Sequence, residues 1–276
     1  INKVLYGSEN GVVTALEAEN GELSWQSKVK GEDIAAPALD SGKLVVNTAS
    51  GVMKAFNASN GQDDWQIEQD VPPLSLRGIS APVISGGGVI VGSADGSLAV
   101  YLLEQGRQGW TADIGEATGS TELERVVDVD STPLVYGENI YTVSSRGNLS
   151  AVELRSGRVL WQRQYSSYRE ISISGNSLFL TDVKGHVYAI DRNNGLELWS
   201  QLSFMNRGVT GPVPIGNYVV VGDFEGYLHW LDQSTGEVVA RHQVDSSGIY
   251  TTPTVANGVL YAQSRDGDLE AITIPE

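Results

Sequence analysis

Cysteine is absent from the 276-residue chain, and its absence removes several kinds of chemistry. Thiol nucleophiles, zinc–thiolate sites and disulfides all need the cysteine sulfur, so the sequence excludes all three. Long apolar runs are missing as well, because no stretch approaches the roughly 20 apolar residues that a membrane-spanning helix requires. The sequence therefore predicts neither a disulfide-stabilised fold nor a membrane-spanning helix.

Positive charge is scarce. The chain carries 18 basic and 34 acidic residues, a formal net charge of −16. A surface this acidic repels phosphate backbones, and no Lys/Arg cluster is longer than two residues. Nucleic acid is therefore not expected as a partner.

Histidine is scarcer still, with only three residues: His186, His229 and His242. None of them stands in the HxH or HExxH spacing of a zinc site. The spacing favours ordinary strand or turn histidines over metal ligands. We expect no metal and no cofactor.

Glycine is abundant, with 32 residues, and much of it marks a repeat along the whole chain. The unit is an apolar strand, a turn containing Gly, a second strand, an Asx-rich turn ending in Gly, and a strand with Trp. Its clearest copy is LFLTDVKGHVYAIDRNNGLELW at 178–199. A period near 40 with alternating strands indicates an all-β β-propeller with four-stranded antiparallel blades. The first-turn glycines are Gly11, Gly51, Gly96, Gly147, Gly185, Gly226 and Gly267.

The strands of a blade are called A to D here. A short strand A, usually carrying Pro, precedes each unit, and the unit supplies strands B, C and D. The chain opens directly on a strand B at Val4, five complete blades follow, and the last unit lacks strand D. We therefore expect residues 1–276 to form a single propeller domain of about seven blades, truncated at the N-terminus of a longer protein.

Five of the six tryptophans occupy one position of the repeat, namely Trp25, Trp65, Trp110, Trp161 and Trp199. A residue that recurs once per blade is spread over all blades rather than gathered in one site. The pattern therefore favours packing between neighbouring blades over a ligand platform. Trp230, in a strand C, lies outside this pattern, and a functional role for it stays open.

The Gly-and-Trp repeat resembles that of the pyrroloquinoline-quinone dehydrogenases, so a quinoprotein-like dehydrogenase or small-molecule-binding propeller is the first alternative function. Many of those enzymes carry a disulfide between adjacent cysteines, which is impossible here. The acidic residues fall mainly in the repeat turns, as at Asp95 and Asp266. A sensor or ligand-binding ectodomain is a third alternative. The sequence favours a non-enzymatic binding scaffold.

Two connections between strand D of one blade and strand A of the next are longer than the others, at 69–78 and 115–128. Strands alternate in direction within a blade, so these connections emerge at the same end as the B–C turns. The two blades concerned are consecutive. We therefore expect the enlarged connections to form one ridge, and function in repeat proteins concentrates where the repeat is broken.

A candidate partner-binding set lies in these connections and where the strand A after the second one is expected to begin: Leu74, Leu76, Arg77, Asp128 and Asp130. Leucines in a loop that begins with prolines suit a contact that becomes buried on binding. The planar guanidinium of Arg77 can form two parallel hydrogen bonds to a carboxylate. The structural alternative is that Leu74 and Leu76 fill the rim of the propeller while Arg77 pairs with Asp128 or Asp130. The residues alone favour neither interpretation.

Several of these segments are specific enough to indicate a family. PPLSLRG at 72–78, ATGSTELERVVDVDSTP at 117–133 and GDFEGYLHW at 222–230 resemble BamB, the outer-membrane protein assembly factor of Gram-negative bacteria. The resemblance covers essentially the whole chain. It implies an eight-bladed propeller in a lipoprotein held at the periplasmic face of the outer membrane by an N-terminal lipid anchor.

The resemblance also implies a function. A BamB-like chain would be a non-enzymatic scaffold of the β-barrel assembly machinery that binds the periplasmic polypeptide-transport (POTRA) domains of BamA. Nascent outer-membrane proteins are a further expected partner. The family's contact residues match the leucines, Arg77 and both aspartates of the candidate set. The family's lipidated cysteine has no counterpart in this sequence.

Overall fold

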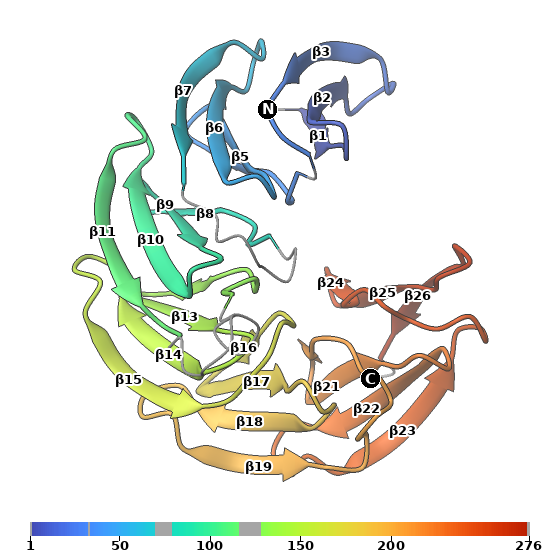
Figure 1. Ribbon diagram of the computed structural model, residues 1–276. Helices are drawn as coiled ribbons and strands as arrows, with labels where there is room; N and C mark the ends of the chain where they lie inside the picture. Colours follow the sequence, from blue (N-terminus) through green and yellow to red (C-terminus); the bar gives the residue numbers. More distant parts are fainter. Residues whose placement is uncertain (1, 33, 70–78, 116–127, 275–276) are drawn as a thin grey trace. The chain divides into compact units, whose positions relative to one another are not determined.

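The computed structural model describes residues 2–32, 34–69, 79–115 and 128–274, and these residues are all-β (Figure 1). They contain strands and turns but no helix, and hence none long and apolar enough to cross a membrane. The strands form seven antiparallel sheets, five with four strands and two with three. The fold is the predicted β-propeller fold.

Three sheets come first in the chain. They consist of β1 (Lys3–Gly7), β2 (Val12–Glu17) and β3 (Leu23–Lys28); β4 (Ala38–Asp40), β5 (Lys43–Asn47), β6 (Val52–Asn57) and β7 (Asp63–Glu68); and β8 (Val83–Ser85), β9 (Gly88–Gly92), β10 (Ser97–Leu102) and β11 (Gln108–Asp113).

Four sheets follow. They consist of β12 (Leu134–Tyr136), β13 (Asn139–Val143), β14 (Asn148–Glu153) and β15 (Val159–Gln164); β16 (Ser172–Ser174), β17 (Ser177–Thr181), β18 (Val187–Asp191) and β19 (Glu197–Gln201); β20 (Val213–Ile215), β21 (Tyr218–Gly222), β22 (Tyr227–Asp232) and β23 (Val238–Gln243); and β24 (Thr254–Ala256), β25 (Val259–Gln263) and β26 (Leu269–Thr273).

The chain packs as two compact units, Ile1–Leu160 and Trp161–Glu276, called the N-terminal and C-terminal units below. Each unit is described by itself. That residues 1–276 form a single domain stays a prediction.

All seven predicted B–C hairpins are present, with the expected glycine in each turn at positive φ. The conformation alone favours Gly at these positions. Close approach adds a second reason, because a Cβ at Gly11 would lie 2.6 Å from the Val29 carbonyl oxygen. A Cβ at Gly185 would lie 2.6 Å from the Phe204 carbonyl oxygen. The glycines thus let the connection leaving strand D pass over the turn.

The predicted Pro residues stand directly before the A strands β4, β8, β12, β20 and β24. Because Pro lacks an N–H, a place just outside the strand leaves the hydrogen bonds of the sheet intact. The proline pattern therefore marks where each of these blades begins. The residues are Pro37, Pro82, Pro133, Pro212 and Pro253.

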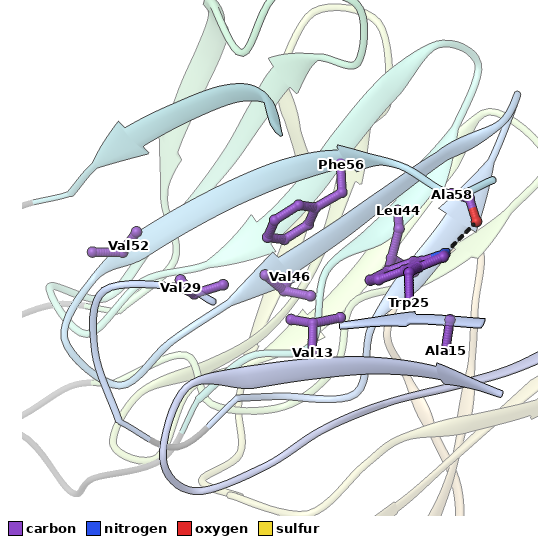
Figure 2. Packing of buried hydrophobic residues seen from close by; sticks show 9 residues of the cluster. All are labelled: Val13, Ala15, Trp25, Val29, Leu44, Val46, Val52, Phe56 and Ala58. Carbon is purple, nitrogen blue, oxygen red and sulfur yellow. Dashed lines mark hydrogen bonds between the residues drawn. The ribbon is translucent and has the colours of Figure 1, made fainter. Parts of the chain in front are cut away.

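The B and C strands of the five four-stranded sheets are largely buried, as in β9, where all five residues are buried. Their apolar side chains form the core between successive sheets. In Figure 2, Trp25 of β3 lies in such a cluster with Leu44, Val46 and Phe56 from the next sheet. The Trp25 and Phe56 ring centroids are 6.4 Å apart.

The five repeat tryptophans pack as the structural interpretation predicted. Each indole N–H donates to a carbonyl oxygen of the C–D turn in the next sheet, and each indole covers the glycine of that turn, where a Cβ would collide with the ring. Loss of a buried Trp costs about 3–5 kcal/mol. The donor–acceptor distances are Trp25 to Ala58, 3.2 Å; Trp65 to Leu103, 2.7 Å; Trp110 to Leu154, 3.0 Å; Trp161 to Arg192, 3.0 Å; and Trp199 to Gln233, 2.8 Å.

Trp230, which stood outside the repeat pattern, is buried in the core of the C-terminal unit. Its ring meets Tyr218 edge-on, with centroids 6.0 Å apart. Both observations assign this tryptophan to packing between sheets.

Candidate functional site

The predicted partner-binding set divides between described and undescribed residues. Leu74, Leu76 and Arg77 lie outside the described residues. The expected contact of Arg77 with Asp128 or Asp130 therefore stays a prediction. The two aspartates are described, and they lie at the C-terminal end of the second enlarged connection.

The backbone at Asp128 is tied to the turns of two blades. The Val129 N–H donates to the Ser93 carbonyl oxygen at 3.1 Å, and the Ser145 N–H donates to the Asp128 carbonyl oxygen at 2.9 Å. The Val129 side chain is buried in the core between the two blades. The end of the second enlarged connection is thus a fixed part of the fold.

The two carboxylates differ in exposure, because Asp128 is fully buried and Asp130 is only half-buried. Strand β12 begins at Leu134, so both residues precede strand A rather than begin it as expected. Burial raises the pKa of Asp130 to about 6, and the negative charge of Asp128 adds to the effect. A cation arriving at Asp130 would relieve an unfavourable negative charge.

The ends of both enlarged connections are joined by a hydrogen bond. Ser80, which follows the first connection, donates from its Oγ to the carbonyl oxygen of Ser131 at 3.2 Å. The Ser80 carbonyl accepts from Asn47 Nδ2 at 3.1 Å, and its Oγ accepts from the Gly92 N–H at 3.0 Å. The described ends of the two connections therefore lie side by side in the N-terminal unit.

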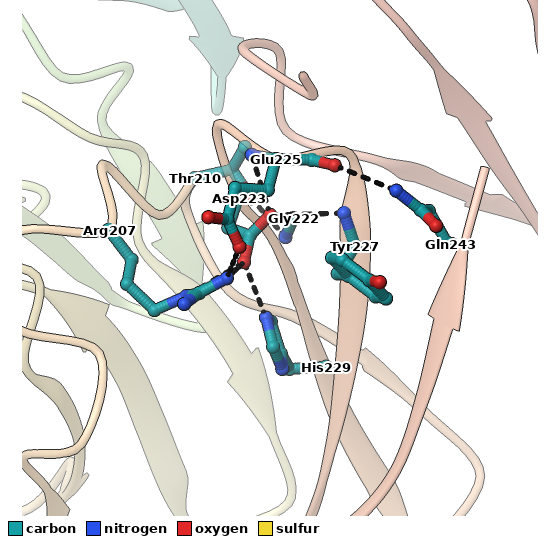
Figure 3. Close-up of polar contacts among 8 residues, drawn as sticks. All are labelled: Arg207, Thr210, Gly222, Asp223, Glu225, Tyr227, His229 and Gln243. Atoms are coloured by element: carbon teal, nitrogen blue, oxygen red, sulfur yellow. Dashed lines mark hydrogen bonds and ion pairs between the residues drawn. The ribbon is translucent and has the colours of Figure 1, made fainter. Parts of the chain in front are cut away.

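A second polar cluster, which sequence reasoning missed, surrounds Asp223 in the C-terminal unit (Figure 3). Asp223 is fully buried, and its Oδ2 accepts from Arg207 Nε at 2.9 Å and from Arg207 Nη2 at 2.6 Å. His229 Nε2 lies 2.7 Å from the same oxygen, and Arg207 also pairs with Glu225 at 2.5 Å. The cluster joins the connection before β20 to the β21–β22 hairpin.

The charge of Asp223 is strongly stabilised. Burial by itself raises the pKa of this carboxyl, but hydrogen bonds from His229, Arg207 and the Tyr227 N–H outweigh it and lower the pKa to about 2. Asp223 is therefore ionised throughout the physiological range. Its role is to hold Arg207 and His229 in place.

The B–C turns contain the signal for this cluster. At the first turn position of six hairpins, a side-chain oxygen accepts the backbone N–H four residues later. In four of them the residue is Ser or Thr; in two it is Asp, whose second oxygen is left for another partner. The pairs are Ser8–Val12, Thr48–Val52, Ser144–Asn148, Asp182–His186, Asp223–Tyr227 and Ser264–Asp268.

Asp182 uses its second oxygen in the same way as Asp223. Its Oδ2 lies 3.1 Å from His186 Nδ1 and accepts from the Tyr188 hydroxyl at 3.2 Å. His229 and Tyr188 occupy equivalent positions, three residues after their turn glycines, whereas His186 directly follows its turn glycine. Both histidines contact a turn carboxylate. Among the residues that the structure describes, no group of three or more His, Asp or Glu side chains could hold a metal ion.

The fold and these sites define a β-propeller built from the Gly- and Trp-marked quinoprotein-like repeat. Its polar clusters lie in the turns and connections, where the blades differ from one another. The model of the family described as outer membrane protein assembly factor BamB matches residues 2–201 and 184–275. The chain belongs to this family.

Individual relatives agree with the family assignment. The chain is 44% identical over 274 residues to outer membrane protein assembly factor BamB of Shewanella oneidensis, covering 99% of this chain and 69% of the relative. It is 49% identical over 271 residues to the BamB of Alteromonas naphthalenivorans, covering 97% of this chain and 65% of the relative. The chain thus spans about two thirds of the length of these relatives.

Solved structures support the fold. The crystal structure of BamB from Moraxella catarrhalis superposes with a TM-score of 0.92 at 30% identity, covering 98% of this chain and 81% of that one. Quinohemoprotein alcohol dehydrogenase from Comamonas testosteroni reaches a TM-score of 0.63 at 13% identity, covering 95% of this chain and 68% of that one. This second likeness concerns the fold alone.

Proposed function

We propose that this chain is a non-enzymatic scaffold subunit of the outer-membrane β-barrel assembly machinery, and that it binds the periplasmic POTRA domains of BamA. The family assignment supports a role in outer-membrane protein assembly. In the full-length protein we place the propeller at the periplasmic face of the outer membrane, held by an N-terminal lipid anchor. Nascent outer-membrane proteins are a further proposed partner.

The hydrogen bond between Ser80 and Ser131 is the observation that carries this proposal. It brings together the described ends of the two connections that break the repeat. The residues that follow each connection are fixed by hydrogen bonds, so both connections end at neighbouring, well-anchored positions. A partner could therefore contact both connections at once.

The chemistry of the proposed site suits a protein partner. Leu74 and Leu76 would provide apolar anchors, and Arg77 would offer a planar fork to a carboxylate. Burial raises the pKa of Asp130, which means that its negative charge is unfavourable there. A cation from the partner would stabilise that charge. Strand addition is the binding mode we favour, with an edge strand of the partner pairing with the loop backbone.

Titration of the immobilised chain with soluble BamA periplasmic domains tests the proposal. We expect saturable binding, and Leu76→Ala with Arg77→Ala should lower the affinity about thirtyfold, since a lost hot spot costs about 2 kcal/mol or more. The matched control is Leu23→Ala with Arg155→Ala. Leu23 begins β3 directly after one C–D turn, and Arg155 lies in another C–D turn, the one after β14.

The control variant should bind within twofold of the wild-type affinity. If Leu76 and Arg77 only fill the rim, their double variant melts earlier and loses binding through unfolding. Wild-type affinity in a stably folded double variant would rule out the proposed site. An absorption band from a bound quinone in the purified chain would contradict the non-enzymatic assignment.

A further inference from the structure

Large apolar side chains are exposed at one end of the sheets of the C-terminal unit. Val183 and Phe224 occupy B–C turns, and Tyr168, Met205 and Tyr250 lie in the connections between strands D and A. All five are between 41 and 56% exposed. Since D–A connections and B–C turns emerge at the same end of a blade, these residues belong to one end of the unit.

Two tyrosine–arginine pairs are joined within this end. The Arg169 guanidinium lies over the Tyr168 ring, 4.9 Å from its centroid, and the Arg265 guanidinium lies 5.8 Å from the Tyr250 centroid. Arg169 Nη1 also donates to the Tyr250 carbonyl oxygen at 3.3 Å. These four residues, called the Tyr–Arg cluster below, come from two connections and one B–C turn.

The backbone holds the cluster in place. The Arg265 N–H donates to the Gly248 carbonyl oxygen at 2.8 Å, which fixes the turn that carries Arg265. A Cβ at Gly248 would lie 2.8 Å from Cε2 of Tyr250, so the glycine allows the ring to rest on the backbone. The neighbouring Ile249 is fully buried. An exposed Tyr on such a support loses little entropy when it binds a partner.

A pocket of about 570 Å³ lies beside the cluster. Its lining residues are Tyr250, Thr251, Gln263, Ser264 and Arg265. The volume suits one or two side chains of a partner, and Arg265 among the lining residues can pair with a carboxylate.

Several acidic side chains at this end already have partners, whereas the exposed Asp266 beside Arg265 forms no ion pair within the described parts of the chain. Asp182 and Asp223 are occupied by His186 and by the Arg207–His229 pair, and both oxygens of Asp245 accept from Ser247. By contrast, no ion pair involves Arg169, Lys184 or Arg265 among the residues that the structure describes. Their cationic groups are open to a partner although the whole chain carries a net charge of −16.

We propose that the Tyr–Arg cluster and its pocket bind an extended polypeptide segment that carries aromatic side chains next to carboxylates. Tyr and Arg are the residue types enriched in interface hot spots. The rings stack on the partner's aromatic side chain, and the guanidinium edges left free by ring stacking receive the carboxylates. This site is separate from the one proposed for the BamA domains, because all of its residues lie in the C-terminal unit.

Calorimetric titration with a synthetic peptide tests this site. The probe is the acetylated and amidated peptide Ser-Phe-Asp-Tyr-Asp-Phe-Ser, and the comparison peptide has Lys in place of both Asp residues. We expect wild-type chain to bind the acidic peptide at least tenfold more tightly than the basic one. Tyr250→Ala with Arg265→Ala should weaken binding of the acidic peptide at least tenfold.

Two further variants make the test specific. Arg241→Ala removes an arginine that stacks on Tyr227 at 5.3 Å, outside the cluster, and should leave the affinity within twofold. Arg265→Glu alters one exposed residue and should reverse the preference between the two peptides. Equal binding of both peptides, or wild-type affinity in the folded double variant, would overturn the proposal.

The alternative ligand is a lipid surface. If the chain cosediments with vesicles of phosphatidylethanolamine and phosphatidylglycerol but binds neither peptide, the polypeptide site is refuted. Binding of the BamA domains is measured separately and should not change in the Tyr250→Ala, Arg265→Ala variant. A failure of one proposal therefore leaves the other standing.

Discussion

The two units share one scaffold but differ in their B–C turns. In the N-terminal unit the second turn position holds Glu9 and three small residues, Ala49, Ala94 and Ser145. In the C-terminal unit the same position holds a bulky residue: Val183, Phe224 and Arg265. In both units the residue at the first turn position and the turn glycine stabilise the turn, through a side-chain hydrogen bond and a positive φ. The second position is therefore free to vary, and it sets the surface chemistry of each unit.

Two aspartates show the same contrast in electrostatic terms. Asp130 of the N-terminal unit has a pKa raised to about 6 by burial and by the charge of Asp128. Asp223 of the C-terminal unit is also buried, but His229 and Arg207 lower its pKa to about 2. The first carboxylate still lacks full compensation for its charge, whereas the second has it from within its own unit. A partner's cation has more to contribute at Asp130.

The largest expected effect tests the shared scaffold. Trp65→Ala in the N-terminal unit and Trp199→Ala in the C-terminal unit should each lower the free energy of unfolding by about 3–5 kcal/mol, because each leaves a cavity over a turn glycine. Denaturant unfolding followed by far-ultraviolet circular dichroism measures both. Trp199→Phe should cost less, since it keeps a ring. A loss under about 1 kcal/mol for either Ala variant would show that the units are not built alike.

The next effect concerns the buried carboxylate of the C-terminal unit. Asp223→Asn keeps an acceptor for the turn but removes the charge that Arg207 and His229 contact. We expect a loss of about 1.5–3 kcal/mol, the usual range for hydrogen bonds to charged groups. Asp266→Asn, in the exposed turn before β26, is the control and should stay within about 0.5 kcal/mol. Equal stability of the two variants in denaturant unfolding would contradict this role.

The pH dependence of stability should have opposite signs for the two aspartates. The pKa of Asp223 is lowered, so its contribution is present above about pH 4 and is lost as the pH falls toward about 2. The pKa of Asp130 is raised to about 6, so stability falls as the pH rises from about 4 to about 6. The free energy of unfolding of each variant should be measured across this pH range. Asp223→Asn should lose only the decrease at low pH, and Asp130→Asn only the decrease between about pH 4 and about pH 6. If both variants showed the same change in the pH dependence of stability, the predicted difference between Asp223 and Asp130 would be wrong.

The smallest effect tests the turns themselves. Phe224→Ala should change the free energy of unfolding by less than about 1 kcal/mol, because Phe224 lies in a turn and is 41% exposed. It should still weaken binding of the acidic peptide about threefold, a change of roughly 0.7 kcal/mol. Ala94→Phe in the N-terminal unit should leave peptide binding unchanged, since the pocket lies in the other unit. Gain of binding in that variant would mean that any exposed ring suffices.

The sequence predicts the scaffold well, because the scaffold depends on local and periodic signals. Gly at positive φ, Pro before strand A and one Trp per blade each report a constraint within a few residues of their own position. The Asp223 cluster could not be found in this way, since Arg207 lies 16 residues away and its approach depends on how the connection folds. The one available signal was Asp in a turn position where most blades have Ser or Thr.

The site residues show the same limit. The sequence indicates where the repeat is broken, but not that Asp128 is buried while Asp130 stays half-buried. That difference arises from the backbone bonds of Val129 and Asp128 to the turns of two blades. The contact expected between Arg77 and these aspartates remains a prediction.

A cross-titration of two variants with two ligands tests the division of labour between the units most directly. The account predicts that Leu76→Ala with Arg77→Ala loses about thirtyfold in affinity for the BamA periplasmic domains. The same variant should keep wild-type affinity for the acidic peptide. Tyr250→Ala with Arg265→Ala should show the reverse. If each variant weakens both ligands equally while the thermal midpoints stay unchanged, the two units do not carry separate surfaces, and the account is contradicted.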